Sequence, residues 1–368
     1  MISGCATSEG TAGYGARFAH YPENYRALAG LTVSSIGMGT YLGEGDAAMD
    51  AAYAETLHTA LLGGVNIVDT AVNYRFQRSE RVIGQVLTEL IGEGKITREE
   101  IVVATKGGYL TFDGEMPPNP RAWFEEHFLK PGIVSNADIV QGSHCITPRY
   151  LNSMVEISRQ NLGLETIDIY YLHNPETQLA AVNRADFRER IARAFRFFEQ
   201  AVSEGRIKLY GVATWNAFRV PKKDRSYVSL LELVEVAREA GGENHHFRVV
   251  QLPYNLAMAE ALTVQNQPLP GGGTGSLLAC AARLGIGVCA SASLLQGQLT
   301  NKLPSIIDET FVGMNSDAQR ALQFVRSTPG IDVALAGMAS AVHVTHNLET
   351  AKHPPAAFDT LMKLFETA

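Results

Sequence analysis

The chain has 368 residues and a formal net charge of -7, from 31 Lys and Arg against 38 Asp and Glu, and 46% of its residues are hydrophobic. Its basic residues are scattered, which argues against nucleic acid as the main partner. No apolar run approaches the roughly 20 residues that span a bilayer, so no membrane partner is expected.

Residues 1–20 are expected to form a flexible leader, ahead of a single domain over residues 21–368. The start of the chain is rich in Gly, Ser, Thr and Ala and lacks the apolar segment of an export signal. The cysteines show no spacing typical of a metal site or a disulfide pair: Cys5, Cys145, Cys280 and Cys289. A cytoplasmic location, where thiols stay reduced, is therefore expected.

The first elements form a hairpin, a strand, a helix and a second strand. Alternating residues around a glycine predict the hairpin over 25–33, and a strand follows at 35–40. Apolar residues at helical spacing from Asp46 predict a helix that ends at Gly63-Gly64. The apolar run from Val65 to Val68 then predicts a buried strand that stops at Asp69.

The same alternation of strand and helix continues along the chain. Further strands are predicted over 101–105, 167–172, 209–213, 247–252, 286–291 and 333–336, with helical patterns between them and after the last. Eight strands in this rhythm predict a single (β/α)8 TIM barrel with an N-terminal β-hairpin and long βα loops. A doubly wound sheet is the competing fold, but no Gly-x-Gly-x-x-Gly turn follows a strand. Residues 107–147 show no clear period, which is typical of a functional loop or a lid.

Four polar side chains stand at or just beyond the ends of three successive predicted strands. Asp69 and Tyr74 follow the second strand, Lys106 follows the third, and His173 follows the fourth. The carboxyl ends of parallel strands meet at one rim of a barrel, so these side chains are expected to converge there. No metal-ligand set is expected at the same rim, because no His-x-His pattern ends a strand.

Together these four groups suit proton transfer to a carbonyl oxygen. An ammonium favours the phenolate and lowers the pKa of a nearby tyrosine, and a carboxylate keeps that ammonium charged. Histidine orients the carbonyl oxygen or joins the proton relay. Hydride for the carbonyl carbon must come from a cofactor, because no side chain donates it.

With these residues in these positions, the chain resembles the aldo-keto reductase superfamily over about residues 25–348. The matching segments are Gly37–Thr40, Asp69–Ala71 with Tyr74, Ala104–Lys106, Asn161–Leu164, Ile167–His173, Gly205–Val212 and Leu299–Lys302. The resemblance implies an oxidoreductase that interconverts a carbonyl (an aldehyde, ketone or sugar) and an alcohol. It implies Tyr74 as the general acid/base, Lys106 and Asp69 as its tuning groups, and His173 as the residue that positions the substrate oxygen.

The resemblance also implies NADP(H) as the cofactor, bound extended across the rim. The implied cofactor positions run from the nicotinamide ribose through the carboxamide and pyrophosphate to the adenosine end: Thr40, Asp69, Gln251, Ser291, Leu294, Gly297, Gly337, Ser340 and Asn347.

Three departures from the family pattern bear on the cofactor. Thr214 stands where a Ser-Asn pair often holds the carboxamide and is a candidate substitute for that pair, and Ala290 stands where an aromatic ring often stacks on the nicotinamide. The adenosine end offers His343 and His346 instead of Lys or Arg, which weakens the preference for a 2′-phosphate and leaves NAD(H) open. The changes at Thr214 and Ala290 motivate an alternative function, a cofactor-binding regulatory or redox-sensing barrel with little turnover.

Overall fold

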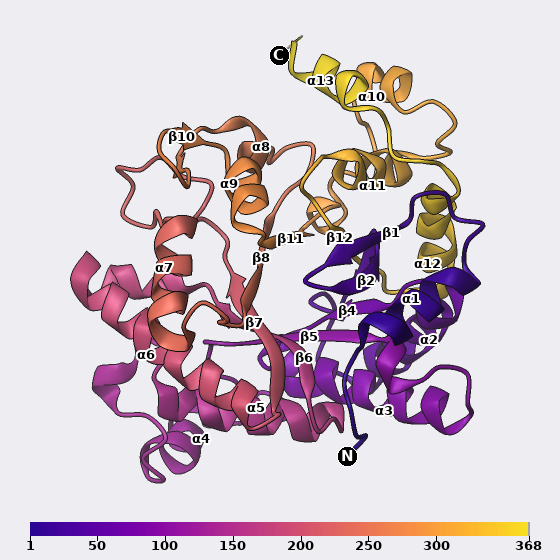
Figure 1. Ribbon diagram of the computed structural model, residues 1–368. Helices are drawn as coiled ribbons and strands as arrows, with labels where there is room; N and C mark the ends of the chain where they lie inside the picture. The colour runs from indigo at the N-terminus through magenta and orange to yellow at the C-terminus, as the bar shows by residue number, and fades with distance from the viewer. Residues whose placement is uncertain (367–368) are drawn as a thin grey trace.

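The centre of the molecule is a closed barrel of eight parallel strands (Figure 1). It is seen in a computed structural model that describes residues 1–366. The order round the barrel is β11-β12-β3-β4-β5-β6-β7-β8, so successive barrel strands lie side by side. The barrel strands are β3 (Ile36–Gly39), β4 (Ile67–Asp69), β5 (Val102–Gly107), β6 (Ile167–His173), β7 (Ile207–Ala213), β8 (Phe247–Pro253), β11 (Gly287–Ser291) and β12 (Val333–Gly337). The predicted (β/α)8 barrel is confirmed.

A ring of helices surrounds the strands, one after each barrel strand (Figure 1). Local signals set their ends: the Thr147 hydroxyl accepts from the backbone N–H of Tyr150, and Gly64 ends the first of these helices at φ 111°. The ring helices are α2 (Ala47–Gly63), α3 (Arg78–Gly92), α5 (Pro148–Leu162), α6 (Arg184–Ser203), α7 (Leu230–Gly241), α9 (Leu277–Leu284), α11 (Asp317–Ser327) and α12 (Ala341–Leu348).

The predicted hairpin before the barrel is present as β1 (Tyr25–Leu28) and β2 (Leu31–Ser34), which pair antiparallel. Its side chain Leu28 belongs to the same apolar cluster as the inner strand residues Ile67 and Val333. The hairpin therefore contributes to the core inside the barrel.

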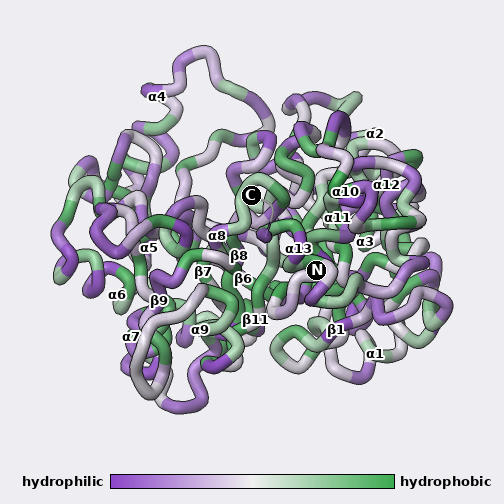
Figure 2. Tube along the Cα trace, turned by 90° about the horizontal axis from the view of Figure 1, so that it is seen from above, coloured by the Kyte–Doolittle hydropathy of each residue, from purple (hydrophilic) through white to green (hydrophobic). Residues whose placement is uncertain are grey.

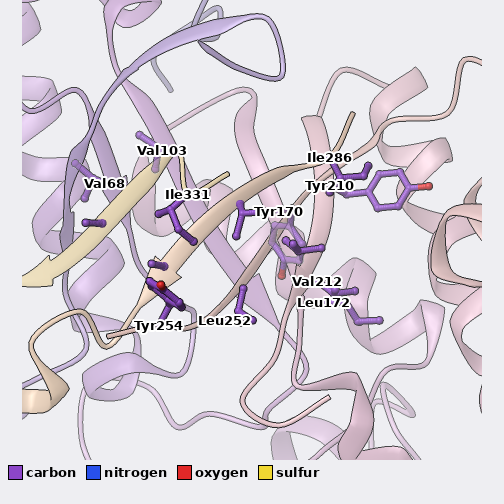
Figure 3. Close-up of a cluster of buried hydrophobic side chains, with 14 of the residues drawn as sticks. Val68, Val103, Tyr170, Leu172, Tyr210, Val212, Leu252, Tyr254, Ile286 and Ile331 are labelled. Atoms are coloured by element: carbon purple, nitrogen blue, oxygen red, sulfur yellow. The ribbon is translucent and has the colours of Figure 1, made fainter. Parts of the chain in front are cut away.

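Neighbouring residues along most of the barrel strands belong to two different cores. Val68, Tyr170, Leu172 and Tyr210 pack in the large core between strands and helices, where Figure 3 shows them. The residues beside them along the strands form a smaller cluster inside the barrel, which includes Ile67, Ala104, Ile169, Tyr171, Val249 and Cys289. This alternation is the period of two that a strand imposes on its side chains.

The N-terminal segment is packed, and the expected flexible leader over residues 1–20 differs from the structure. Helix α1 (Ser8–Arg17) begins at Thr7, whose hydroxyl accepts from the backbone N–H of Gly10. The Tyr14 ring is fully buried, and its hydroxyl donates to the backbone oxygens of Leu61 and Val65. The apolar residues of this N-terminal segment are too few and too widely spaced to predict a packed helix from their periodicity.

The loop over residues 107–147 has short elements and an apolar cluster of its own. Helix α4 (Pro120–Phe124) lies on a part of it that projects from the body of the molecule (Figure 2). Phe128, Val134 and Cys145 pack with Tyr150 of α5 beneath it. The end of the loop returns to the barrel rim, where Tyr109 and His144 form an isolated β-bridge.

The C-terminal segment ends in α13 (Phe358–Glu366), which packs beside α10 (Ser305–Thr310) and α11. The remaining α-helix and strands are α8 (Glu260–Thr263), β9 (Gln267–Pro268) and β10 (Thr274–Gly275). Within residues 1–366, no helix has the length and apolar character needed to cross a membrane.

Candidate active site

A cavity of about 910 Å³ lies at the carboxyl ends of the barrel strands. Seven of the eight strands contribute a residue from or near their last position: Gly39, Asp69, His173, Ala213, Gln251, Ser291 and Gly337. The sequence-based expectation that polar strand ends meet at one rim therefore agrees with the geometry.

The strand period explains why these side chains point into the barrel mouth. Asp69, Lys106, His173 and Gln251 each stand two positions beyond a residue of the inner cluster, so they continue its inward face. Each of these four strands carries apolar side chains below and a polar one at the rim.

Lys106 connects the predicted residues. Its ammonium Nζ lies 2.5 Å from Oδ1 of Asp69, 2.8 Å from the backbone oxygen of Thr70 and 3.3 Å from the hydroxyl of Tyr74. The ammonium therefore uses all three of its hydrogens. The other carboxylate oxygen of Asp69 accepts from the side-chain amide of Gln251 at 2.7 Å.

Burial and charge act in opposite directions on these groups. Burial by itself lowers the pKa of Lys106, but the Asp69 carboxylate raises it, and the net pKa lies above its usual value. Burial raises the pKa of Tyr74, and Lys106 offsets only part of the rise. The sequence-based expectation of a lowered phenol pKa is therefore wrong for this structure, because burial outweighs the ammonium. Tyr74 is a neutral phenol with a proton to donate.

His173 lies beside Tyr74, with 6.1 Å between their ring centroids. Burial, the Lys106 charge and His144 hold the pKa of His173 well below its usual value, so its imidazole is neutral. Its Nδ1 atom is buried and has no hydrogen-bond partner within residues 1–366. The ring of Tyr109 covers another side of the imidazole at 5.0 Å.

His144 supports the backbone of His173. Its Nε2 lies 2.7 Å from the carbonyl oxygen of His173, and its Nδ1 lies 2.7 Å from the side-chain amide of Gln178. Because a carbonyl only accepts, Nε2 carries the hydrogen and Nδ1 accepts from Gln178. Burial lowers the pKa of His144 to about 4, which keeps this tautomer neutral.

The expected cofactor positions are gathered along the same cavity. Those that line it are Thr40, Asp69, Thr214, Gln251, Ser291, Leu294, Gly297, Gly337 and Asn347. Ser340 lies just outside the lining, next to Ala339, and its hydroxyl caps α12. His343 and His346 also line this end, and none of the described lining residues is Lys or Arg.

The structure changes the interpretation of two departures. The Thr214 hydroxyl donates to the carboxylate of Glu176 at 3.0 Å and accepts from the backbone N–H of Ala217, so its one hydrogen is already engaged. Ala290 is fully buried in the core between strands and helices and faces away from the cavity. A stacking role at Ala290 is therefore excluded by the strand register.

Several further residues line the cavity. Tyr41 and Trp215 are partly exposed at its edge, at 56% and 43%, and the Tyr41 ring lies 5.0 Å from that of Tyr74. Tyr109 and Asn174 also line it, and the Asn174 amide donates to the Tyr109 hydroxyl at 3.1 Å. The sequence signals two of these residues, because Trp215 follows the fifth predicted strand at the rim and Asn174 directly follows His173. Tyr41 and Tyr109 have no such pattern.

The fold and the site together define a class, a (β/α)8 barrel protein in which a buried Asp-Lys pair contacts a tyrosine hydroxyl at the carboxyl ends of the strands. The family model described as "Aldo/keto reductase family" matches residues 35–360. The chain therefore belongs to the aldo-keto reductase family.

Comparisons with individual proteins agree with this membership. The chain is 27% identical over 208 residues to the NADH-specific methylglyoxal reductase of Escherichia coli, a match over 55% of this chain and 54% of that protein. It is 29% identical over 196 residues to the D-threo-aldose 1-dehydrogenase of a Pseudomonas species, over 51% and 52% of the two chains. The matches thus span about half the length of these curated relatives.

A solved aldo/keto reductase from Klebsiella pneumoniae, in complex with NADP and acetate, has the same fold. Its TM-score is 0.61 at 20% sequence identity, and the match covers 94% of this chain and 95% of that one.

Proposed function

We propose that this protein is an NAD(P)(H)-dependent oxidoreductase that interconverts a carbonyl and an alcohol. The observation that carries the proposal is the contact of one buried ammonium, Lys106, with both the Asp69 carboxylate and the Tyr74 hydroxyl at the cavity. A protonated phenol in such a place suits the delivery of a proton to a carbonyl oxygen.

Each residue of the cluster has a separate proposed role. Tyr74 donates the proton in reduction and takes it back in oxidation. Lys106 stabilises the phenolate that donation leaves behind, and Asp69 keeps the ammonium charged and directed at the phenol. His173 is neutral, so it donates a hydrogen bond to the substrate oxygen without competing for the proton.

The cavity fits a nicotinamide cofactor. Its volume of about 910 Å³ falls within the range of cofactor sites, and it extends from Tyr74 to the residues around α12. Gln251 and Thr40 would hold the nicotinamide end, and Ser291, Gly297 and Asn347 would hold the rest. When bound, the cofactor supplies the hydride that no side chain provides.

The lining of the cavity favours small, neutral carbonyl substrates. The rings of Tyr41, Tyr109 and Trp215 line the cavity. Asn73 also lines it, and its side-chain oxygen is buried without a hydrogen-bond partner within residues 1–366. No described Lys or Arg in the lining would pair with a carboxylate or a phosphate. The named relatives acting on methylglyoxal and on aldoses support the same substrate class.

The test is a cofactor titration followed by a turnover assay. NADH and NADPH are titrated by quenching of protein fluorescence, and the tighter one is then used with a panel of neutral aldehydes, ketones and sugars beside carboxylated analogues. We expect turnover of neutral members and its loss in Tyr74→Phe, while that variant still binds the cofactor. Tight binding with no turnover across the panel would instead support a regulatory barrel.

We also propose the cytoplasm as the location. All four cysteines are free in the part of the chain that the structure describes, and the three buried ones, Cys145, Cys280 and Cys289, have thiol pKa values raised by burial. Unpaired thiols are typical of a reducing compartment. Fractionation of the source cells, followed by detection with an antibody to this chain, tests the location.

A further inference from the structure

The backbone directly after Tyr74 is strained. Arg75, Phe76 and Gln77 have φ angles of 49°, 57° and 74°, so three consecutive residues with side chains occupy the left-handed region. A residue with a Cβ atom pays a free-energy cost there, and a run of such residues persists only where the surroundings hold it. The position of this turn, one residue from the proposed proton donor, raises the question of what holds it.

The Arg75 side chain provides the largest set of contacts. Its guanidinium donates to the backbone oxygens of Glu44 at 2.7 Å and Asp46 at 3.2 Å, and to the carboxylate of Asp50 at 2.6 Å. The side chain is 1% exposed. We call this set of contacts the Arg75 clamp.

The clamp joins the turn to residues 41–46, which connect β3 to α2 and are called the Tyr41 loop below. Tyr41 and Leu42 of this loop line the cavity, and the Tyr41 ring lies edge-on to the Tyr74 ring. Tyr53 of α2 donates to the backbone oxygen of Leu42 at 2.8 Å, and the Arg75 guanidinium lies 5.2 Å from the Tyr53 ring centroid. One arginine therefore connects the proton donor to the wall of its own cavity.

A second contact between loop and turn leaves little room for adjustment. A Cβ atom built on Gly45 would come within 3.0 Å of the Phe76 ring, so the loop and the turn are in van der Waals contact there. On the other side of the turn, Gln77 donates its side-chain amide to the backbone oxygen of Phe112. The strained turn is thus enclosed between the Tyr41 loop and the start of the 107–147 loop.

We propose that Arg75 is a positioning residue for the reaction. The Arg75 clamp fixes the Tyr41 loop against the left-handed turn, which keeps the Tyr74 hydroxyl within hydrogen-bonding reach of Lys106 and keeps the cavity wall closed over the phenol. This inference rests on the proposed function, because it assigns Arg75 a part in the proton transfer of Tyr74.

The variant Arg75→Gly separates positioning from folding. Glycine adopts φ 49° without the free-energy cost that arginine bears there. This relief of backbone strain offsets part of the stability lost with the clamp, so the variant is expected to fold. We expect kcat to fall about 10- to 100-fold, because small misplacements of a reacting group have effects of this size. The thermal midpoint is expected to stay near that of the wild type.

The pH dependence of kcat is a second measurement, because a purely structural role of Arg75 would leave it unchanged. In alcohol oxidation Tyr74 must act as a phenolate, and the Lys106 ammonium lowers the pKa of that phenol. When the phenol moves away from Lys106, the rise of kcat with pH is expected to shift to higher pH. Arg75→Lys keeps the charge but cannot reach all three acceptors, so an intermediate shift is expected.

Arg193→Gln is the matched control. Arg193 lies on α6, away from the turn, and pairs with Glu189 at 2.9 Å on the surface, with 63% of its side chain exposed. Removal of this arginine is expected to leave kcat, KM and the pH profile unchanged.

Hydrogen–deuterium exchange of residues 41–46 completes the test without relying on turnover. Arg75→Gly is expected to speed exchange in the Tyr41 loop and Arg193→Gln to leave it unchanged. Wild-type kcat and pH profile in Arg75→Gly, or activity lost only in proportion to unfolding, would overturn the inference. If the wild-type protein turns over no substrate, the proposed function fails, and unchanged exchange in the loop would then reject the clamp on its own.

Discussion

The Nζ atom of Lys106 lies 2.5 Å from Oδ1 of Asp69, and the two side chains are only 1% and 8% exposed. A pair of this kind costs desolvation energy, which the mutual attraction repays only with good geometry and further hydrogen bonds. Both conditions are met here. Thr70 and Tyr74 accept the remaining hydrogen bonds of the ammonium, and Gln251 donates to the second oxygen of the carboxylate. The pair therefore holds a buried positive charge against the Tyr74 hydroxyl.

Replacement of Tyr74 by phenylalanine removes the proposed proton donor and leaves the ring in place. We expect kcat/KM to fall about 10²- to 10⁴-fold, which is the usual contribution of a general acid. Steady-state kinetics measures the loss, and fluorescence titration is expected to show cofactor affinity close to that of the wild type. Full activity in this variant would contradict the role of Tyr74.

Lys106→Met is expected to be both inactive and unstable. It leaves the Asp69 carboxylate buried without its counter-charge, and such a loss costs about 3–5 kcal/mol of unfolding free energy. Urea denaturation measures it. The double variant Asp69→Asn with Lys106→Met removes both charges, so it is expected to recover much of the stability and none of the activity. Equal stability of the single and double variants would argue against a coupled buried pair.

The adenosine end of the cavity sets the choice between NADH and NADPH. Since His343 and His346 stand there and no described lining residue is Lys or Arg, NADH is expected to bind at least as tightly as NADPH. His343→Arg would supply a charge-assisted hydrogen bond to the 2′-phosphate, worth about 1.5–3 kcal/mol. We expect a gain of roughly ten-fold or more in NADPH affinity. NADH affinity is the internal control, and an equal gain for both cofactors would place the 2′-phosphate elsewhere.

The buried His144 makes stability depend on pH. Its pKa falls from 6.5 to about 4 on folding, so between these values the unfolded chain binds more protons than the folded one. The contribution of His144 to the free energy of unfolding is therefore fully present above pH 6.5 and is lost as the pH falls towards 4. The full loss is on the order of 3 kcal/mol.

His144→Gln isolates this contribution, because the variant keeps a neutral side chain and all other titrating groups. Urea denaturation of both proteins at pH 7 and pH 4.5 is the measurement. The wild type is expected to lose more stability between the two pH values than the variant loses. The same loss in both proteins would show that His144 does not titrate on unfolding.

Local patterns in the sequence determined the fold and the part of the site that lies on strands. Strand and helix signals alternate along the whole barrel, and a period of two places Asp69, Lys106 and His173 on the inward face of their strands. These positions are predictable because a strand fixes the direction of each side chain from that of its neighbour. The N-terminal segment was different: α1 has no apolar period, and burial of Tyr14 against α2 holds it in place.

Only the tertiary structure decided what surrounds the reacting groups. The left-handed turn at Arg75 has no glycine to announce it, and its support comes from Glu44 and Asp50, which are distant in sequence. His144 reaches His173 from the end of a long loop, and burial reverses the expected direction of the Tyr74 pKa. Such features depend on contacts between distant segments and on exclusion of water, and neither is encoded in the local spacing of residues.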